Sequence, residues 1–184
     1  GEIISFGLFY KDFTNPIELV IKNENNNISP ENVDKAFLYG AEFEFRKNLG
    51  FIDLLKSFYF GMNLTLVHSQ VDLSDYEYEI RKAYDKDAKS KRELQGQSPY
   101  VLNLDLSYIN PEIGTDVSVS FNVFGKRLSK VGFGTPDFYE FPKPDLNLVI
   151  GKELFDVVKV KFTAKNILDS KYYEASTFNG EDYI

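Results

Sequence analysis

The residues that could perform chemistry are few in this sequence. His68, the single histidine, stands beside Ser69, and the pair could suggest a general base next to a nucleophile. Neighbouring residues of a β-strand point to opposite faces, so these side chains are not expected to share the hydrogen bond that such catalysis needs. We therefore interpret His68 as an interface residue near the end of a strand.

An acidic segment follows, with Asp72, Asp75, Glu77 and Glu79 close together. Carboxylate oxygens are ligands that calcium accepts. Basic residues come directly afterwards and would neutralise this charge: Arg81, Lys82, Lys86, Lys89, Lys91 and Arg92. The segment is therefore interpreted as a solvated loop whose charges compensate one another, and no metal site is expected.

Other short motifs carry no chemistry on their own. Glu42 and Glu44 would share one strand face, but nothing in the sequence places an opposed carboxylate across a cleft, as glycoside hydrolysis requires. Gly132-Phe133-Gly134 lacks the third glycine of a dinucleotide-binding turn. The N-glycosylation patterns at Asn27-Ile28-Ser29 and Asn63-Leu64-Thr65 are interpreted as chance matches. We expect no catalytic residue and no cofactor, in a protein that is not an enzyme.

The composition excludes several classes of protein. The chain has 184 residues, 43% of them hydrophobic, with 17 Phe, 12 Tyr and a formal net charge of −7. A basic surface for nucleic acid is therefore not expected, and the absence of cysteine excludes disulfides and Cys-based sites. No run approaches the roughly 18 apolar residues of a membrane-spanning helix, and no signal peptide is recognisable. Since Gly1-Glu2-Ile3-Ile4 already lies in an apolar pattern, we expect a piece of a longer protein.

β-Strands must position these residues, because apolar and polar side chains alternate with a period of two. Between Tyr100 and Tyr108, leucines occupy one face while Asn103, Asp105 and Ser107 occupy the other. The same alternation predicts about seven strands. They begin near Ile4, Phe37, Phe58, Tyr100, Val117, Leu146 and Val158. The segment Ile17–Lys22 is expected to continue the first strand, with Pro16 marking a bulge or an edge position.

Short and long connections alternate along the chain. Short turns are predicted at 48–57, 110–114 and 154–156, and long polar loops at 23–34, 72–98, 128–144 and from Ser170 to the end. Short turns at one end and long loops at the other are typical of an up-and-down barrel wall. The loop after Asp72 could contain a short helix from Glu79 to Lys91.

Two environments could accept such strands. In a soluble lipocalin-like barrel or sandwich the apolar faces would pack on one another, whereas in a membrane barrel they would face lipid and the polar faces a hydrated interior. The segments Ser57–Val71 and Thr115–Leu128 reach the length of about 9 to 11 residues that tilted membrane strands need. We favour an all-β, antiparallel, up-and-down transmembrane β-barrel segment of about seven or eight strands. A soluble all-β ligand-binding module is the alternative.

The membrane interpretation predicts which side chains are exposed. In the protein alone, apolar residues of the strand faces should be accessible, and their polar neighbours should line the interior. The apolar set is Leu104, Leu106, Val119, Phe121, Val160 and Phe162, and the polar set is Asn103, Asp105, Ser120, Asn122, Lys161 and Thr163. Burial of the apolar set in a common core would favour the soluble alternative.

Several segments carry motifs of a known kind. A Tyr-Gly-x-Glu strand motif occurs at Tyr39-Gly40-Ala41-Glu42 after Asn32, and Asn166-Ile167-Leu168-Asp169 is similar to an Asn-Leu-x-Asp strand ending. Further matching segments are 94–103, 121–127, and 137–140 followed by 144–148. In this order the segments resemble the barrel of TonB-dependent outer-membrane receptors.

This resemblance implies a transporter that binds and imports a scarce solute, such as an iron chelate, a vitamin or a glycan. TonB would energise import through a plug domain. Neither a plug nor a TonB box is identified within residues 1–184, and large plugged barrels have about 22 strands, so the whole chain is interpreted as the C-terminal part of the barrel. The implied location is the outer membrane of a Gram-negative bacterium, with lipid, TonB and the solute as partners and no nucleic acid.

The long loops would meet the solute first, since the resemblance places them on the external face. Aromatic rings there could stack on a sugar or a chelate. The candidates for ligand binding are Tyr76, Tyr78, Tyr84, Phe138 and Tyr139, with Phe133 and Phe141 nearby. The simpler interpretation of the same rings is loop packing or a position at the membrane interface.

Overall fold

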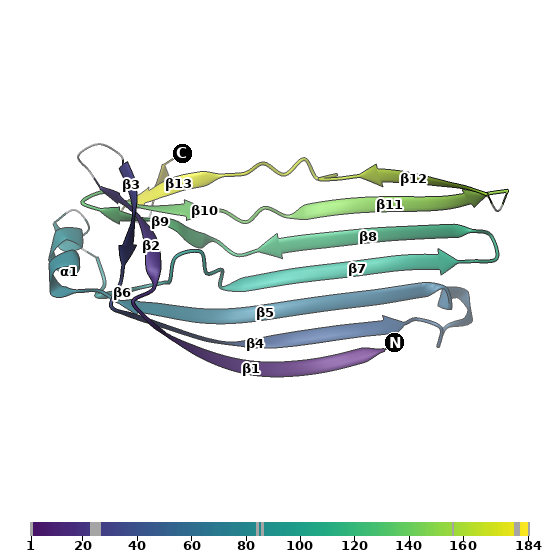
Figure 1. Ribbon diagram of the computed structural model, residues 1–184, viewed down its shortest axis with the longest axis horizontal. Helices are drawn as coiled ribbons and strands as arrows, with labels where there is room; N and C mark the ends of the chain where they lie inside the picture. Colours follow the sequence, from purple (N-terminus) through teal and green to yellow (C-terminus); the bar gives the residue numbers. More distant parts are fainter. Residues whose placement is uncertain are drawn as a thin grey trace.

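The structure, a computed structural model, describes residues 2–22, 27–83, 85, 87–155, 157–178 and 181–183. Seven long strands form one antiparallel sheet, which we call the wall, in the order β1 (Ile3–Thr14), β4 (Lys35–Asn48), β5 (Phe58–Asp72), β7 (Tyr100–Asn110), β8 (Thr115–Phe124), β11 (Asp145–Leu154) and β12 (Val158–Ala164) (Figure 1). The short strand β6 (Lys91–Arg92) pairs with the end of β5. The predicted all-β, antiparallel, up-and-down segment is confirmed.

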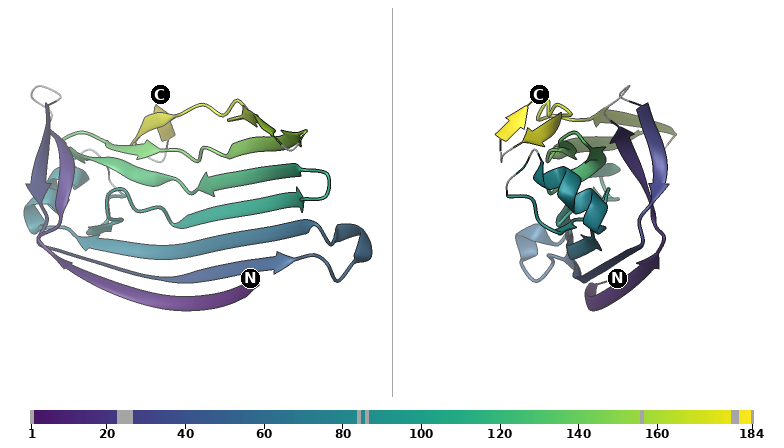
Figure 2. Two further views of the ribbon diagram at one scale, coloured as in Figure 1. Left: turned by 45° about the vertical axis from the view of Figure 1, so that its right-hand side comes forward. Right: turned by 90° about the vertical axis from the view of Figure 1, so that its left-hand side faces the viewer.

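The wall is an open segment in the part of the chain that the structure describes. Its order runs from β1 to β12, and these two edge strands do not pair with each other (Figure 2). No helix among the described residues is long and apolar enough to cross a membrane.

A second sheet, which we call the cap, lies at one end of the wall (Figure 1). Its order is β14 (Glu181–Tyr183), β13 (Glu174–Phe178), β10 (Asp137–Glu140), β9 (Arg127–Phe133), β2 (Ile17–Lys22) and β3 (Asn27–Asn32). The prediction of loops at 23–34, 128–144 and beyond Ser170 was therefore wrong. The strands in these segments satisfy their backbone hydrogen bonds by pairing, β3 with its neighbour β2 and β9 with β10, while the β2–β9 and β10–β13 pairs join parts that lie far apart in the sequence.

The short connections gather at the other end of the wall, as predicted (Figure 1). The β4–β5 connection contains a 3₁₀ turn, η1 (Asp53–Leu55), and residues 111–114 form the turn between β7 and β8. The wall therefore has one simple end and one elaborated end.

The strand registers give the wall one apolar face and one polar face. Direct neighbours on successive strands form an apolar row of Ile4, Phe45, Met62, Leu104, Phe121 and Leu146. The next residues form a polar row of Ser5, Glu44, Asn63, Asn103, Asn122 and Asp145. Because side chains alternate along every strand, two rows that differ by one residue lie on opposite faces.

Side-chain exposure agrees with the membrane interpretation. Leu106, Val160 and Phe162 are 42%, 49% and 57% exposed, and Leu104, Val119 and Phe121 are half-buried. None of these six residues belongs to the buried cluster of the described chain, which consists of Val20, Leu128 and Val131 in the cap. The polar set is exposed or half-buried. The apolar wall face therefore does not pack into a common core, as it would in the soluble alternative.

Strand β2 continues β1, as predicted, but leaves the wall. Thr14 pairs with Lys35 and Ile17 with Asn32, so the register is unbroken. Between these pairs, the amide of Asn15, at a positive φ of 52°, donates to the Asp34 carbonyl at 3.0 Å. The bend carries the β2–β3 hairpin over to the cap, where β2 runs parallel to β9.

The helix after Asp72 is displaced from its predicted position. It spans α1 (Asp75–Lys82), and the predicted range Glu79–Lys91 overlaps only its last turn. The Ser74 hydroxyl accepts a hydrogen bond from the Glu77 amide at 3.2 Å and caps the helix. Ser74 and Glu77 have the spacing of a capping box. The sequence therefore contained a signal for the start of this helix, which a search for alternating apolar residues did not detect.

Candidate functional site

His68 and Ser69 lie on opposite faces of β5 and do not act together. The His68 ring lies 5.1 Å from the Tyr39 ring on the apolar face. The Ser69 hydroxyl accepts a hydrogen bond from the Leu94 amide at 3.1 Å. The two side chains therefore have separate partners, as the strand geometry predicted.

The acidic residues beside α1 are paired with basic ones. Asp72 lies 3.6 Å from Lys91, and Glu79 lies 3.2 Å from Lys82. Among the described residues, no group of three or more His, Asp or Glu side chains is arranged to hold a metal ion. Glu77 departs from the expected solvated loop, because its side chain is only 14% exposed and contacts Arg81 and Arg92.

Glu77 belongs to an ion-pair network that joins α1 to the cap. The two terminal guanidinium nitrogens of Arg92, Nη1 and Nη2, donate to the Glu18 carboxylate at 2.9 and 2.5 Å. Arg81 likewise donates to both oxygens of Asp137, at 2.7 and 2.9 Å. Burial disfavours the charged form of Arg92, yet the hydrogen bonds and charge of Glu18 raise its pKa above the ordinary value. The network therefore fixes β2, β6, α1 and β10 relative to one another.

Gln95 completes this connection with uncharged hydrogen bonds. Its amide side chain exchanges two hydrogen bonds with the backbone of Leu19, at 2.6 and 2.8 Å. The same Nε2 donates to the Ser129 carbonyl at 2.8 Å. Gln95 thus holds β2 and β9 together where they begin to run in parallel, which stabilises the cap.

The predicted ligand-binding tyrosines of the first long segment lie on α1. Tyr76 is 70% exposed, and its ring lies 5.8 Å from that of Phe133 on β9. Tyr78 is half-buried, with the Lys82 ammonium 5.0 Å from its ring centre. Tyr84 lies outside the described residues. Tyr76 therefore presents an accessible ring above the cap.

Phe138 and Tyr139 are neighbours on β10, so their rings point to opposite faces. Lys130 lies over the Phe138 ring at 5.7 Å. Tyr139 packs against the buried cluster of the cap. Burial, followed by the charges of Glu93 and Asp137, raises the pKa of the Tyr139 phenol. The contacts of Tyr139 are thus mainly those of a packing residue.

A pocket of about 180 Å³ lies next to the Tyr76–Phe133 pair. Its apolar lining consists of Val20, Val33, Val131 and Phe133, and the rest is polar: Glu18, Glu31, Asn32, Asp34, Asp72, Ser74, Glu77 and Arg92. A pocket of this kind can contact an apolar surface and accept hydrogen bonds from hydroxyl or amino groups.

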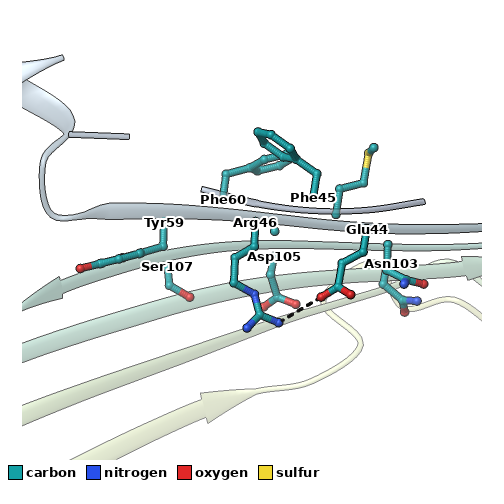
Figure 3. A pocket seen from close by; sticks show the side chains of 11 residues that line it. Glu44, Phe45, Arg46, Tyr59, Phe60, Asn103, Asp105 and Ser107 are labelled. Atoms are coloured by element: carbon teal, nitrogen blue, oxygen red, sulfur yellow. Dashed lines mark ion pairs between the residues drawn. The ribbon is translucent and has the colours of Figure 1, made fainter. Parts of the chain in front are cut away.

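A second polar pocket, of about 320 Å³, lies on the polar face of the wall near its simple end. Figure 3 shows Glu44, Arg46 and Asp105 directed to one side of the sheet, while Phe45 and Phe60 point to the other. The Arg46 guanidinium lies 3.6 Å from Glu44. From the sequence, Glu44 was considered only as a weak catalytic candidate. The polar group around it was missed, because the register that brings Asp105 near Arg46 cannot be inferred from one strand alone.

The sequence was also compared with known protein families and proteins. Residues 1–151 match the family described as TonB dependent receptor-like, beta-barrel. The chain belongs to this family. The match includes β1 to β10 and most of β11, so it covers the wall of this receptor segment up to β11 and the cap apart from β13 and β14, while β12 lies beyond it. A search of curated proteins returned no match. Membership implies interaction with TonB in general, as the receptor class requires.

Proposed function

We propose that this chain is part of a TonB-dependent outer-membrane transporter that binds and imports a scarce solute of the iron-chelate, vitamin or glycan class. It acts by binding and transport and catalyses no reaction. The observation that best supports this proposal is that a chain of this receptor family forms a wall with two continuous faces. One face of the wall is apolar and exposed, and the opposite face is polar.

The spacing of aromatic side chains on the apolar face supports a place in a membrane. Tyr10, Tyr39 and His68 form one row near the cap, and Phe58 lies 5.0 Å from Tyr108 near the simple end. About ten residues of β5 separate these bands, which is roughly 33 Å along a strand and about 25 Å after a tilt near 40°. This height matches the apolar band of outer-membrane barrels, which aromatic girdles flank.

The orientation follows from the same comparison. Outer-membrane barrels have short periplasmic turns and longer external segments, so the cap end faces outward in this proposal. Tyr76 and the adjoining polar pocket then meet the solute first. The aromatic surface and the surrounding carboxylates and amides support a ligand with both apolar and hydrogen-bonding groups.

Insertion can be tested with single tryptophans, because the chain contains none. We expect brominated acyl chains in phosphatidylcholine vesicles to quench the fluorescence of Leu104→Trp strongly. Asn103→Trp is the matched control, since it lies one residue away on the polar face. Equal quenching of both variants, or none in either, would contradict the proposed membrane face.

Transport can be tested in cells that lack the gene for this protein. Growth is compared on a panel of iron chelates, vitamins and glycans, each supplied as the limiting nutrient, with TonB present or depleted. We expect a growth defect on one class, restored by the gene only when TonB is present, and entry of that solute chemically unchanged. Restoration without TonB would contradict the proposal.

A further inference from the structure

Two pockets meet at His68, where the apolar face of the wall ends below the cap. One pocket, of about 410 Å³, is lined mainly by apolar residues, including Leu8, Ala41 and Leu66. The other, of about 350 Å³, is lined by polar and basic residues. Val67, His68 and Pro99 line both pockets. The two pockets therefore adjoin at these three residues, so that an apolar part lies beside a polar part.

The polar part contains three lysines. Lys89 precedes β6 and Lys91 is its first residue, both exposed, and Lys126 follows β8. The rings of Tyr139 and Phe141, 4.7 and 4.6 Å from the Lys126 ammonium, hold that side chain in place. These cations come from two separate connections of the wall, so the pocket is assembled by the fold.

The acidic residues near these lysines do not prevent an anion from binding in the polar pocket. Lys91 is 3.6 Å from Asp72, and Lys126 is 2.8 Å from Asp182. Both are accessible ion pairs, which contribute little free energy and can exchange partners. Glu93 also lines the pocket, while Arg92 is held by Glu18. Gln70 and Gln97 add amide groups that can donate hydrogen bonds.

We propose that the joined pockets bind one phosphorylated acyl lipid of the surrounding leaflet. Its acyl chain lies against Leu8, Ala41 and Leu66, and its phosphate lies among Lys89, Lys91 and Lys126. Lysine ammonium groups bind phosphate as point charges. A lipid explains the shape better than free phosphate does, because free phosphate leaves the apolar pocket empty. This inference rests on the proposed membrane location.

The test compares three probes on the detergent-solubilised protein by native mass spectrometry. Phosphatidic acid carries both the phosphate and the chains, diacylglycerol carries only the chains, and inorganic phosphate carries only the charge. We expect phosphatidic acid to bind much more tightly than either of the others. Inorganic phosphate that binds equally well and displaces phosphatidic acid would overturn the assignment to a lipid.

Matched variants locate the site. The double variant Lys89→Gln and Lys91→Gln should weaken phosphatidic acid binding about fivefold for each lysine removed, while Lys161→Gln with Lys165→Gln, exposed elsewhere in the chain, should leave it unchanged. Ala41→Phe fills the apolar part and should weaken phosphatidic acid without affecting inorganic phosphate.

The result is separable from that of the proposed function. If Leu104→Trp is quenched by lipid while both the lysine variant and Ala41→Phe bind phosphatidic acid normally, the site is refuted and the membrane location stands. The lysine substitutions lie on exposed side chains, so loss of folding is not expected to obscure the outcome.

Discussion

Arg92 and Glu18, 74 positions apart in the sequence, form a doubly hydrogen-bonded ion pair inside the cap, with side chains only 6% and 2% exposed. The pair joins the short strand β6, beside the wall, to the hairpin that leaves β1. Each charge is buried only because the other is present. This contact therefore makes the position of the cap dependent on the wall.

The first prediction concerns this pair. Glu18→Gln removes the carboxylate that both terminal nitrogens of Arg92 contact and leaves the buried charge only the more distant Glu77, at 3.5 Å, so the cap should lose about 3–5 kcal/mol of stability. Replacing both residues, by Glu18→Leu and Arg92→Met, should restore much of the loss. Hydrogen exchange of β2 amides in the detergent-solubilised protein measures the effect.

The exposed pair Lys22–Glu31 on the same hairpin is the control. Lys22→Gln should cost less than about 1 kcal/mol, because exposed ion pairs contribute little. If Glu18→Gln accelerated exchange no more than Lys22→Gln, the buried pair would not be what holds the cap.

The second prediction concerns acid. Burial disfavours the Glu174 carboxylate, but contacts with Lys130 and Ser129 outweigh it and lower the pKa of Glu174 below 4.5. A lowered folded-state pKa stabilises the cap above the ordinary pKa, and this contribution disappears as the pH falls through the folded value. Protease cleavage near β13, measured with an acid-stable protease, should therefore increase as the pH falls below the ordinary pKa of a glutamate, about 4.3. In Glu174→Gln this additional pH dependence should be absent. If the variant and the unmodified protein showed the same dependence of cleavage on pH, Glu174 would not be the group responsible.

The third prediction concerns the solute. Tyr76→Ala removes an exposed ring that lies against Phe133, so binding of the transported solute should weaken by about two- to tenfold. Phe51→Ala is a matched control, because Phe51 is also 70% exposed but lies at the simple end of the wall. Uptake assays with protein levels checked in the membrane distinguish the two. Equal effects of both variants would exclude a specific role for Tyr76.

The fourth prediction uses two neighbours on β7. Leu104→Arg places a charge on the proposed lipid face and should cost about 2–4 kcal/mol if it lies near the bilayer centre. Asn103→Arg places the same charge on the polar face and should cost little. Urea titrations of protein refolded into vesicles provide the comparison. A larger loss for Asn103→Arg would reverse the assignment of the faces.

The wall was predictable from sequence because its strands are long and each carries two distinct faces. The alternation between Tyr100 and Tyr108 determines which side chains share a face, and it needs no knowledge of the neighbouring strand. The register between neighbouring strands, by contrast, was not predictable from this alternation. Nothing within one strand indicates that Asn63, Asn103 and Asn122 become direct neighbours, although the structure aligns them.

The cap was not predictable by the same argument. Asn27–Asn32 includes Pro30 and lacks an apolar alternation, so its sequence does not indicate a strand. An edge strand tolerates the proline because only one of its sides is paired. Glu18 is the polar residue between Ile17 and Leu19, so the pattern assigns it to solvent. Its burial depends on Arg92, which approaches only after the whole intervening chain has folded.

The parallel pairing of β2 with β9 also has a consequence for the order of assembly. Successive wall strands are neighbours, so each can be added as a hairpin onto the one before. The contact between Val20 and Val131 instead closes a loop that encloses β4, β5, β7 and β8, and such long loops close slowly because their entropy must be lost first. The β2–β3 hairpin therefore waits for β9, and its pairing with β9 marks the moment at which the five wall strands β1, β4, β5, β7 and β8 are in place.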